Sequence, residues 1–215
     1  MSQDPEYGIT HPWSAIIHAV AASYHGAMGE THARGWLELT HEDVHVGERG
    51  TRARCLPETW MCEVFHLDGS LRDIRVLDTT RVEWIAVLER LRAVADETEV
   101  EHPYPRLDPV HPAFTDLFHA WADDPEGEGT SFAFRARFGA VWFFALPLYE
   151  EEVEFSVWPE DVLDGAGVAA VLRFLVEVAT ASRRPALLTG ETVRYHPGML
   201  TLISHDPATG ITSHI

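Results

Sequence analysis

Residues 131–158 read SFAFRARFGAVWFFALPLYEEEVEFSVW, and this stretch gives the clearest indication of the fold. It contains three aromatic-rich segments separated by short breaks, at residues 131–138, 141–148 and 153–158. The first segment alternates, with apolar residues on one side (Phe132, Phe134, Phe138) and arginines on the other (Arg135, Arg137). This is the pattern of a strand with one buried and one wet face. We therefore predict antiparallel strands, because parallel strands are usually buried on both faces.

Helices and short strands are predicted on both sides of this stretch. Apolar residues at helical spacing predict helices over residues 12–25, 80–97, 114–121 and 164–182. Thr80 and Glu83 have the spacing of a capping box at the start of the second helix. Alternating patterns predict strands over residues 36–40, 43–46, 60–67, 71–77, 186–189, 199–204 and 211–214. The Asp68-Gly69 pair suits a hairpin turn between residues 60–67 and 71–77.

The order of these elements predicts an α+β fold. Each half of the chain reads helix, about three strands, helix, so we expect two helix-flanked antiparallel sheet lobes, or the same elements merged into one domain. The predicted lobes are residues 1–97 and 112–215. Residues 98–111, rich in proline and acidic residues, are predicted to be a linker or covering loop. A tandem duplication is a hypothesis that rests on element order alone.

The charge of the chain limits its partners. Its 215 residues carry 34 Asp+Glu against 16 Lys+Arg, all of them Arg, so the formal net charge is −18 with the 13 His neutral. An acidic surface repels phosphate backbones and anionic lipid heads. We therefore expect no nucleic-acid or membrane partner. Apolar residues make up 46% of the chain, which is enough for a packed core.

The expected location is cytoplasmic. Two cysteines cannot form a disulfide framework, and the first residues are acidic, unlike a signal peptide. The longest apolar run, residues 140–149, is shorter than the roughly 18 residues that a membrane helix needs.

A possible metal site lies near the N-terminus. The string His41-Glu42-Asp43-Val44-His45 matches H-E-x-x-H, in which a helix places both His on zinc and the Glu activates a bound water. The flanking residues alternate with period 2, which favours a hairpin instead, and in a strand His41 and His45 would lie about 13 Å apart. The preferred interpretation is a surface turn with no cofactor. The alternative is a zinc site with His41 and His45 as ligands and Glu42 as the catalytic base.

A second motif lies at the start of the last predicted helix. Residues 165–170 read GAGVAA and match G-x-G-x-x-A of dinucleotide-binding proteins. No apolar strand leads into the first glycine, and only 45 residues follow Ala170. Close packing of the helix is the preferred interpretation.

Two acidic segments could contact a basic partner. Glu150, Glu151, Glu152 and Glu154 lie beside aromatic-rich strands and are our predicted partner-binding residues. The alternative is a solvated hairpin turn whose neighbouring aromatics belong to the core. Residues 96–128 hold ten acidic residues against Arg106 alone and form a competing acidic segment.

The sequence thus favours a non-enzymatic, acidic protein-binding module, such as an inhibitor, immunity-type or chaperone-like protein, with a basic protein as partner. The alternative function is a zinc-dependent hydrolase that uses the His41–His45 string. The sequence does not indicate the oligomeric state of the chain.

Overall fold

The computed structural model describes residues 56, 58–123, 132–191 and 199–214, all within the unit formed by residues 52–215. The helices are α2 (Thr59–Val64), α3 (Arg81–Val94), α4 (Phe114–Ala122), the 3-10 helix η2 (Pro159–Asp161) and α5 (Gly165–Ser182). The strands are β1 (Arg72–Leu77), β2 (Glu97–Glu101), β3 (Ala133–Phe138), β4 (Val141–Ala145), β5 (Glu152–Val157), β6 (Ala186–Gly190), β7 (Thr201–Asp206) and β8 (Ile211–His214). This mixture of helices and antiparallel strands confirms the predicted α+β class.

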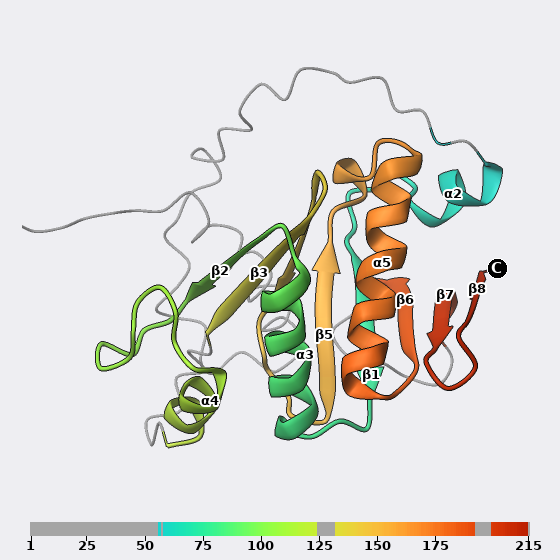
Figure 1. Ribbon diagram of the computed structural model, residues 1–215. Helices are drawn as coiled ribbons and strands as arrows, with labels where there is room; N and C mark the ends of the chain where they lie inside the picture. The colour runs from blue at the N-terminus through green and yellow to red at the C-terminus, as the bar shows by residue number, and fades with distance from the viewer. Residues whose placement is uncertain (1–55, 57, 124–131, 192–198, 215) are drawn as a thin grey trace, which may run out of the picture. The chain divides into compact units, whose positions relative to one another are not determined.

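The described strands form one eight-stranded sheet in the order β2-β3-β4-β5-β1-β6-β7-β8, and every neighbouring pair is antiparallel. β1 lies between β5 and β6, so that Ile74 faces Phe155 on one side and Leu188 on the other. α5 leads from β5 to β6 past the intervening β1 (Figure 1). The sheet thus includes strands from both sides of residues 98–111. The described elements adopt the merged form of the predicted fold, not two separate lobes.

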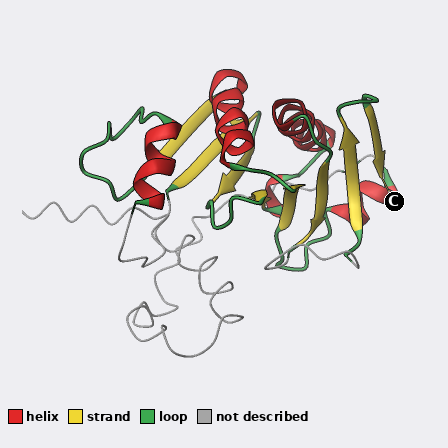
Figure 2. Ribbon diagram, turned by 90° about the horizontal axis from the view of Figure 1, so that it is seen from below, coloured by secondary structure: helices red, strands yellow, loops and turns green. Residues whose placement is uncertain are grey.

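The hydrophobic core lies between this sheet and the three longer helices, which Figure 2 shows together on one side of the strands. Phe174 of α5 is at its centre. Its ring stacks on Phe143 with centroids 3.9 Å apart and meets Phe138 and Phe155 edge-on at 5.4 and 5.0 Å. Such aromatic pairs stabilise a core beyond the area that they bury. The predicted two-faced pattern is confirmed for β3, because Phe134 and Phe138 are buried while Arg135 and Arg137 are partly exposed. It is wrong for β5, which is buried on both faces.

The predicted capping box begins α3. The Thr80 hydroxyl accepts a hydrogen bond from the backbone N–H of Val82 at 3.2 Å, and the Glu83 carboxylate accepts one from the backbone N–H of Thr80 at 3.0 Å. Thr80 also donates its hydroxyl to Glu83, and this bond lowers the pKa of Glu83. A lowered pKa means that this bond stabilises the folded chain above about pH 4.5, and that the contribution is lost as the pH falls below that value.

Thr80→Ala should therefore lower the free energy of unfolding by about 1 kcal/mol, the usual effect of losing an N-cap. Urea denaturation at pH 7 measures it. Thr80→Ser is the matched control, because serine retains a capping hydroxyl and should stay close to the wild type. A Thr80→Ala protein as stable as wild type would show that the cap contributes nothing.

The strand predicted at residues 60–67 is wrong, because residues 59–64 form α2. Burial follows helical spacing: Trp60 and Val64, four residues apart, both turn inward, whereas Cys62 is exposed. A strand would instead have placed Cys62 and Val64 on the same face. The chain does turn at Asp68-Gly69, where Gly69 has φ +81°, but the turn connects a helix to β1 and not two strands.

The prediction of a linker or covering loop at residues 98–111 is wrong at its start, because residues 97–101 form the edge strand β2. Its sequence ETEVE alternates glutamates with β-branched residues, and its burial alternates in the same way. This alternation is typical of a strand and is visible in the sequence, but the acidic composition of the segment favoured the interpretation as a loop. Residues 102–113 then connect β2 to α4 without forming a strand or helix.

The glycine-rich start of α5 packs closely, as predicted. A Cβ on Gly167 would lie 3.2 Å from the Cα of Val162, and the N-terminal turn is capped by the Asp164 carboxylate, which accepts from the Gly167 N–H at 2.9 Å. Of the described helices, α5 alone is long and apolar enough to cross a membrane, by length and composition only. Val168, Phe174 and Leu175 bury one side of it against the sheet, as in the core helix of a soluble protein.

Candidate functional site

A buried charge cluster occupies the centre of the sheet face opposite the helices. Ile74 and Val76 of β1 belong to the core, so the alternating residues Asp73 and Arg75 project to the other face. On the neighbouring β5, Glu154 lies opposite Arg75. Arg75 has no exposed surface, and Asp73 has only 1%. A buried arginine on a sheet needs anionic partners, because an uncompensated charge away from water is very costly.

Three carboxylates surround the Arg75 guanidinium. Nη2 lies 2.8 Å from Asp73 Oδ2, and Nη1 lies 2.9 Å from Glu154 Oε2 and also bonds Glu152 Oε1. Ser156 donates its hydroxyl to the second oxygen of Asp73 at 2.8 Å. Of these groups, Asp73 and Arg75 come from β1 and the others from β5. The Arg75 cluster, as we call these five residues, therefore joins the two central strands through side chains as well as through the main chain.

The protonation of Arg75 is fixed by this environment. Burial lowers the pKa of the guanidinium, but Glu154, Asp73 and Glu152 together raise it, and the net result lies above its ordinary value. Arg75 is therefore positively charged at every physiological pH. Both Nη atoms already bond carboxylates, so the guanidinium is not presented as an anion-binding group. We interpret the cluster as an element that holds β1 and β5 in register.

The predicted partner-binding run is divided by this cluster. Glu152 is buried and Glu154 is half-buried, both beside Arg75. Glu150 pairs with Arg81, whose Nε donates to its Oε1 at 3.1 Å. Of the four glutamates only Glu151 is classed as exposed, while its backbone carbonyl accepts from the Thr79 N–H at 3.0 Å. The four glutamates share one segment, but three have ion-pair partners within the chain.

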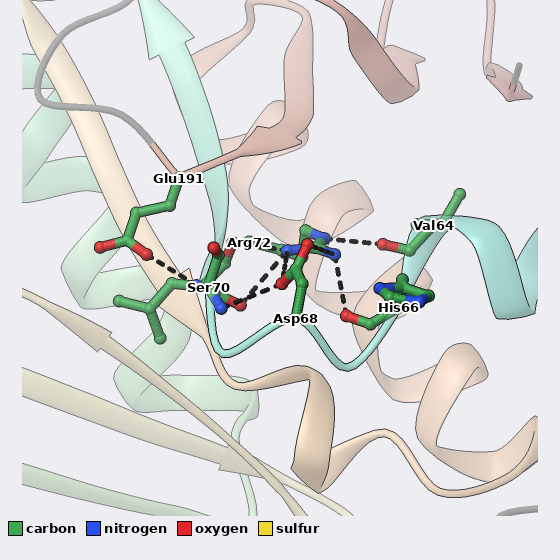
Figure 3. A network of polar contacts seen from close by, with 7 residues as sticks. Val64, His66, Asp68, Ser70, Arg72 and Glu191 are labelled. Atoms are coloured by element: carbon green, nitrogen blue, oxygen red, sulfur yellow. Dashed lines mark hydrogen bonds and ion pairs between the residues drawn. The ribbon is translucent and has the colours of Figure 1, made fainter.

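A second arginine, Arg72, ties the turn after α2 to the start of β1, and Figure 3 shows its contacts. It is 4% exposed and donates to the carbonyl of Val64 at 2.7 Å and to that of His66 at 3.0 Å. Asp68 lies 3.4 Å away on the same turn, and the Leu71 N–H donates to Glu191 at 3.0 Å. The two hydrogen bonds from Arg72 satisfy backbone carbonyls at and just beyond the C-terminal end of α2, where carbonyls have no partner within the helix. Arg72 is therefore a positioning residue for α2.

β2, at one edge of the sheet formed by the described strands, carries a regular set of exposed carboxylates. Glu97, Glu99 and Glu101 alternate along it and are all exposed. Two of them form ion pairs across to β3, Glu99 with Arg135 at 3.1 Å and Glu97 with Arg137 at 3.0 Å. Burial lowers the pKa of Arg135, while Glu99 and Glu101 oppose that effect. No other described segment pairs with the outer side of β2.

Glu97, Glu99 and Glu101 were not singled out from the sequence, although they lie within the competing acidic segment of residues 96–128. Their alternation in ETEVE was the available signal, since a period of two places all three on one side of a strand. What the sequence could not supply is that this strand lies at the edge of the sheet.

The residues of the predicted zinc site, His41, Glu42 and His45, lie outside the described residues, so that site stays a prediction. Among the residues that the structure does describe, no group of three or more His, Cys, Asp or Glu side chains could hold a metal ion.

Comparisons of the chain with models of protein families, with curated proteins and with solved structures gave no match.

Proposed function

We propose that this chain is a non-enzymatic, cytoplasmic protein-binding module that takes a basic protein partner at the acidic edge strand β2. The observation that carries the proposal is the row of three exposed glutamates on a strand whose outer side pairs with no described segment. An open edge offers main-chain donors and acceptors to an extended segment of a partner. The glutamates favour a segment with lysine or arginine, because opposite charges across neighbouring strands stabilise the pair.

The segment around Glu150 is a weaker contact surface than β2. Glu152 and Glu154 are engaged with Arg75, and moving them to a partner would leave that arginine with fewer counter-charges. At β2 the two arginines that form ion pairs with the glutamates lie on the neighbouring strand β3. The glutamates themselves are exposed, so a partner can reach their carboxylates from the outer side of β2. The net charge of −18 supports both surfaces equally, since it attracts a basic partner from a distance.

Replacing Glu97, Glu99 and Glu101 together by glutamine should slow association with the partner about tenfold, because electrostatic steering depends on such local charge. The partner is first recovered at low salt with immobilised wild-type chain, and association is then followed by surface plasmon resonance at several salt concentrations. The rate should fall as ionic strength rises, with little change in dissociation.

The matched control carries Glu63→Gln, Asp116→Asn and Glu160→Gln, which remove the same charge from three exposed positions elsewhere. It should bind nearly as fast as wild type. A partner that is neutral or acidic, or a β2 variant that binds no more slowly than this control, would contradict the proposal.

A further inference from the structure

The loop of residues 102–113 leads from β2 to α4 (Figure 1), and two of its own side chains make hydrogen bonds that hold it. Four of its residues are prolines, which have no backbone N–H to donate. The Asp108 carboxylate accepts from the backbone N–H groups of Val110 and His111, both at 2.8 Å. The ring of His102 forms hydrogen bonds at both of its nitrogens. The shape of this loop therefore depends on the protonation of His102 and Asp108.

The two hydrogen bonds of His102 fit its neutral form and not the imidazolium. Tyr104 donates its backbone N–H to Nδ1 at 3.3 Å, and an amide N–H is always the donor, so Nδ1 carries no proton. Nε2 lies 3.0 Å from the carbonyl oxygen of Asp108, which can only accept, so Nε2 carries the ring proton. An imidazolium has a proton on each nitrogen and cannot accept from Tyr104. His102 thus joins residues 104 and 108 completely only when it is neutral.

We propose that His102 is a pH-sensitive clasp, which holds this loop when neutral and releases the turn at Tyr104 when it is protonated, between about pH 8 and pH 5. Because His102 directly follows Glu101, the last residue of β2, the release occurs beside the contact edge proposed above. The inference goes beyond the proposed function and does not depend on it, since its test needs no partner.

Asp108, the other side chain that holds the loop, does not change its charge in this range. The hydrogen bonds from the backbone N–H groups of His111 and Val110 lower the pKa of Asp108, and the charges of His111 and His102 lower it further. Asp108 is therefore a carboxylate from pH 8 down to pH 5, and its two bonds persist. Within the loop it is the histidines that change charge over this interval.

The remaining charges near His102 do not replace the lost acceptor. Glu101 on β2 and Asp108 attract an imidazolium, but both are exposed, and the attraction between exposed charges is weak. Arg106 of the same loop is also exposed, and Arg92 of α3 donates to the Pro112 carbonyl at the far end of the loop, at 2.9 Å. None of these four groups offers the Tyr104 N–H the acceptor that neutral Nδ1 provides. Neutral His102 therefore stabilises the turn at high pH, and this contribution is lost as the pH falls.

Nuclear magnetic resonance of the 15N-labelled full chain tests this at about pH 7.5 and pH 5.5, on either side of histidine titration. At the higher pH the ring spectra should place the His102 proton on Nε2. Amide exchange is expressed relative to that of an unstructured peptide at the same pH. The protection of the Tyr104 N–H should fall about fivefold at the lower pH, as expected for the loss of one hydrogen bond.

His102→Asn separates protonation from other effects of acid. Its side-chain oxygen can accept from the N–H two residues along the chain, as asparagine does in turns, and it does not titrate. The protection of Tyr104 should then be the same at both pH values. The matched control is His111→Asn, because His111 contributes its backbone N–H to the loop and the variant retains that group. This control should lose Tyr104 protection on acidification, as wild type does.

Several results would overturn the inference. One is a wild-type Tyr104 amide that is equally protected at both pH values, and another is a His102 ring proton on Nδ1 at the higher pH. A loss of protection that persists in His102→Asn, or that disappears in His111→Asn, would do the same. The Ile74 amide of β1 reports on the whole fold in the same spectra. If it lost protection together with Tyr104, the change would be global, and the clasp would be refuted.

Discussion

Replacing Arg75 by methionine should lower the free energy of unfolding by about 3–5 kcal/mol, the usual effect of removing one member of a buried ion pair. The variant leaves the carboxylates of Asp73, Glu152 and Glu154 close together with no cation between them. Asp73 and Glu152 have side chains only 2% and 8% exposed, so water can screen them little. Urea denaturation followed by tryptophan fluorescence measures the loss.

The pH dependence of this variant separates charge repulsion from lost packing. In wild type the pKa of Arg75 is raised, so its contribution is complete at all pH values below the ordinary pKa of arginine and does not change between pH 5 and 8. In Arg75→Met, protonating the carboxylates removes their repulsion, so the stability deficit relative to wild type should shrink from pH 8 to pH 5.

A quadruple variant serves as the control. Arg75→Met with Asp73→Asn, Glu152→Gln and Glu154→Gln removes every charge in the cluster and should recover much of the loss, because neutral groups are cheaper to bury than unpaired charges. If Arg75→Met were as stable as wild type, or as unstable at pH 5 as at pH 8, the cluster would not be holding the strands together by charge.

Glu152→Arg should destabilise the chain at least as strongly as Arg75→Met, whereas Glu151→Arg should change the free energy of unfolding by less than about 0.5 kcal/mol. The first substitution places a second buried cation against Arg75 and removes one of its counter-ions. The second changes a side chain that is open to solvent. The two glutamates are neighbours in sequence with opposite surroundings, so each controls for the other in thermal denaturation.

This pair of variants also determines how the acidic run can be tested as a contact surface. A loss of binding in Glu152→Arg would report unfolding, so it carries no information on the partner. Glu151→Arg leaves the fold intact, so a loss of partner binding in this variant would show that the segment from Glu150 to Glu154 contacts the partner. Equal stability of the two variants would mean that Glu152 is not buried against Arg75 in solution.

The elements that could be predicted from the sequence are those whose signals are local. The strand at residues 133–138 can be predicted because its two faces differ in polarity. α3 can be predicted because apolar residues recur at helical spacing after the capping box of Thr80 and Glu83. The segment at residues 60–67 failed because a short apolar run fits a helix and a strand about equally well. Its true spacing is visible only once Val64 is seen in the core.

The candidate site depended on contacts that no local pattern contains. Arg75 and Glu152 are 77 residues apart, and only the sheet order brings their strands together. From the sequence alone, Glu150 to Glu154 are a run of like charges, and the partners of three of them lie on β1 or at the start of α3. In the same way ETEVE can be recognised as a strand, but its place at the edge follows from where the other seven strands lie.

The central position of β1 also has a consequence for the growing chain on the ribosome. Both of its neighbours, β5 and β6, are made after it, and about 75 residues separate the end of β1 from the start of β5. At synthesis rates of about 5–20 residues per second, Ile74 and Val76 lack both neighbouring strands for about 4–15 s. α5, the helix that packs against β1, is also made later than β1. The middle of the described sheet can thus assemble only after β5 and β6 have been made.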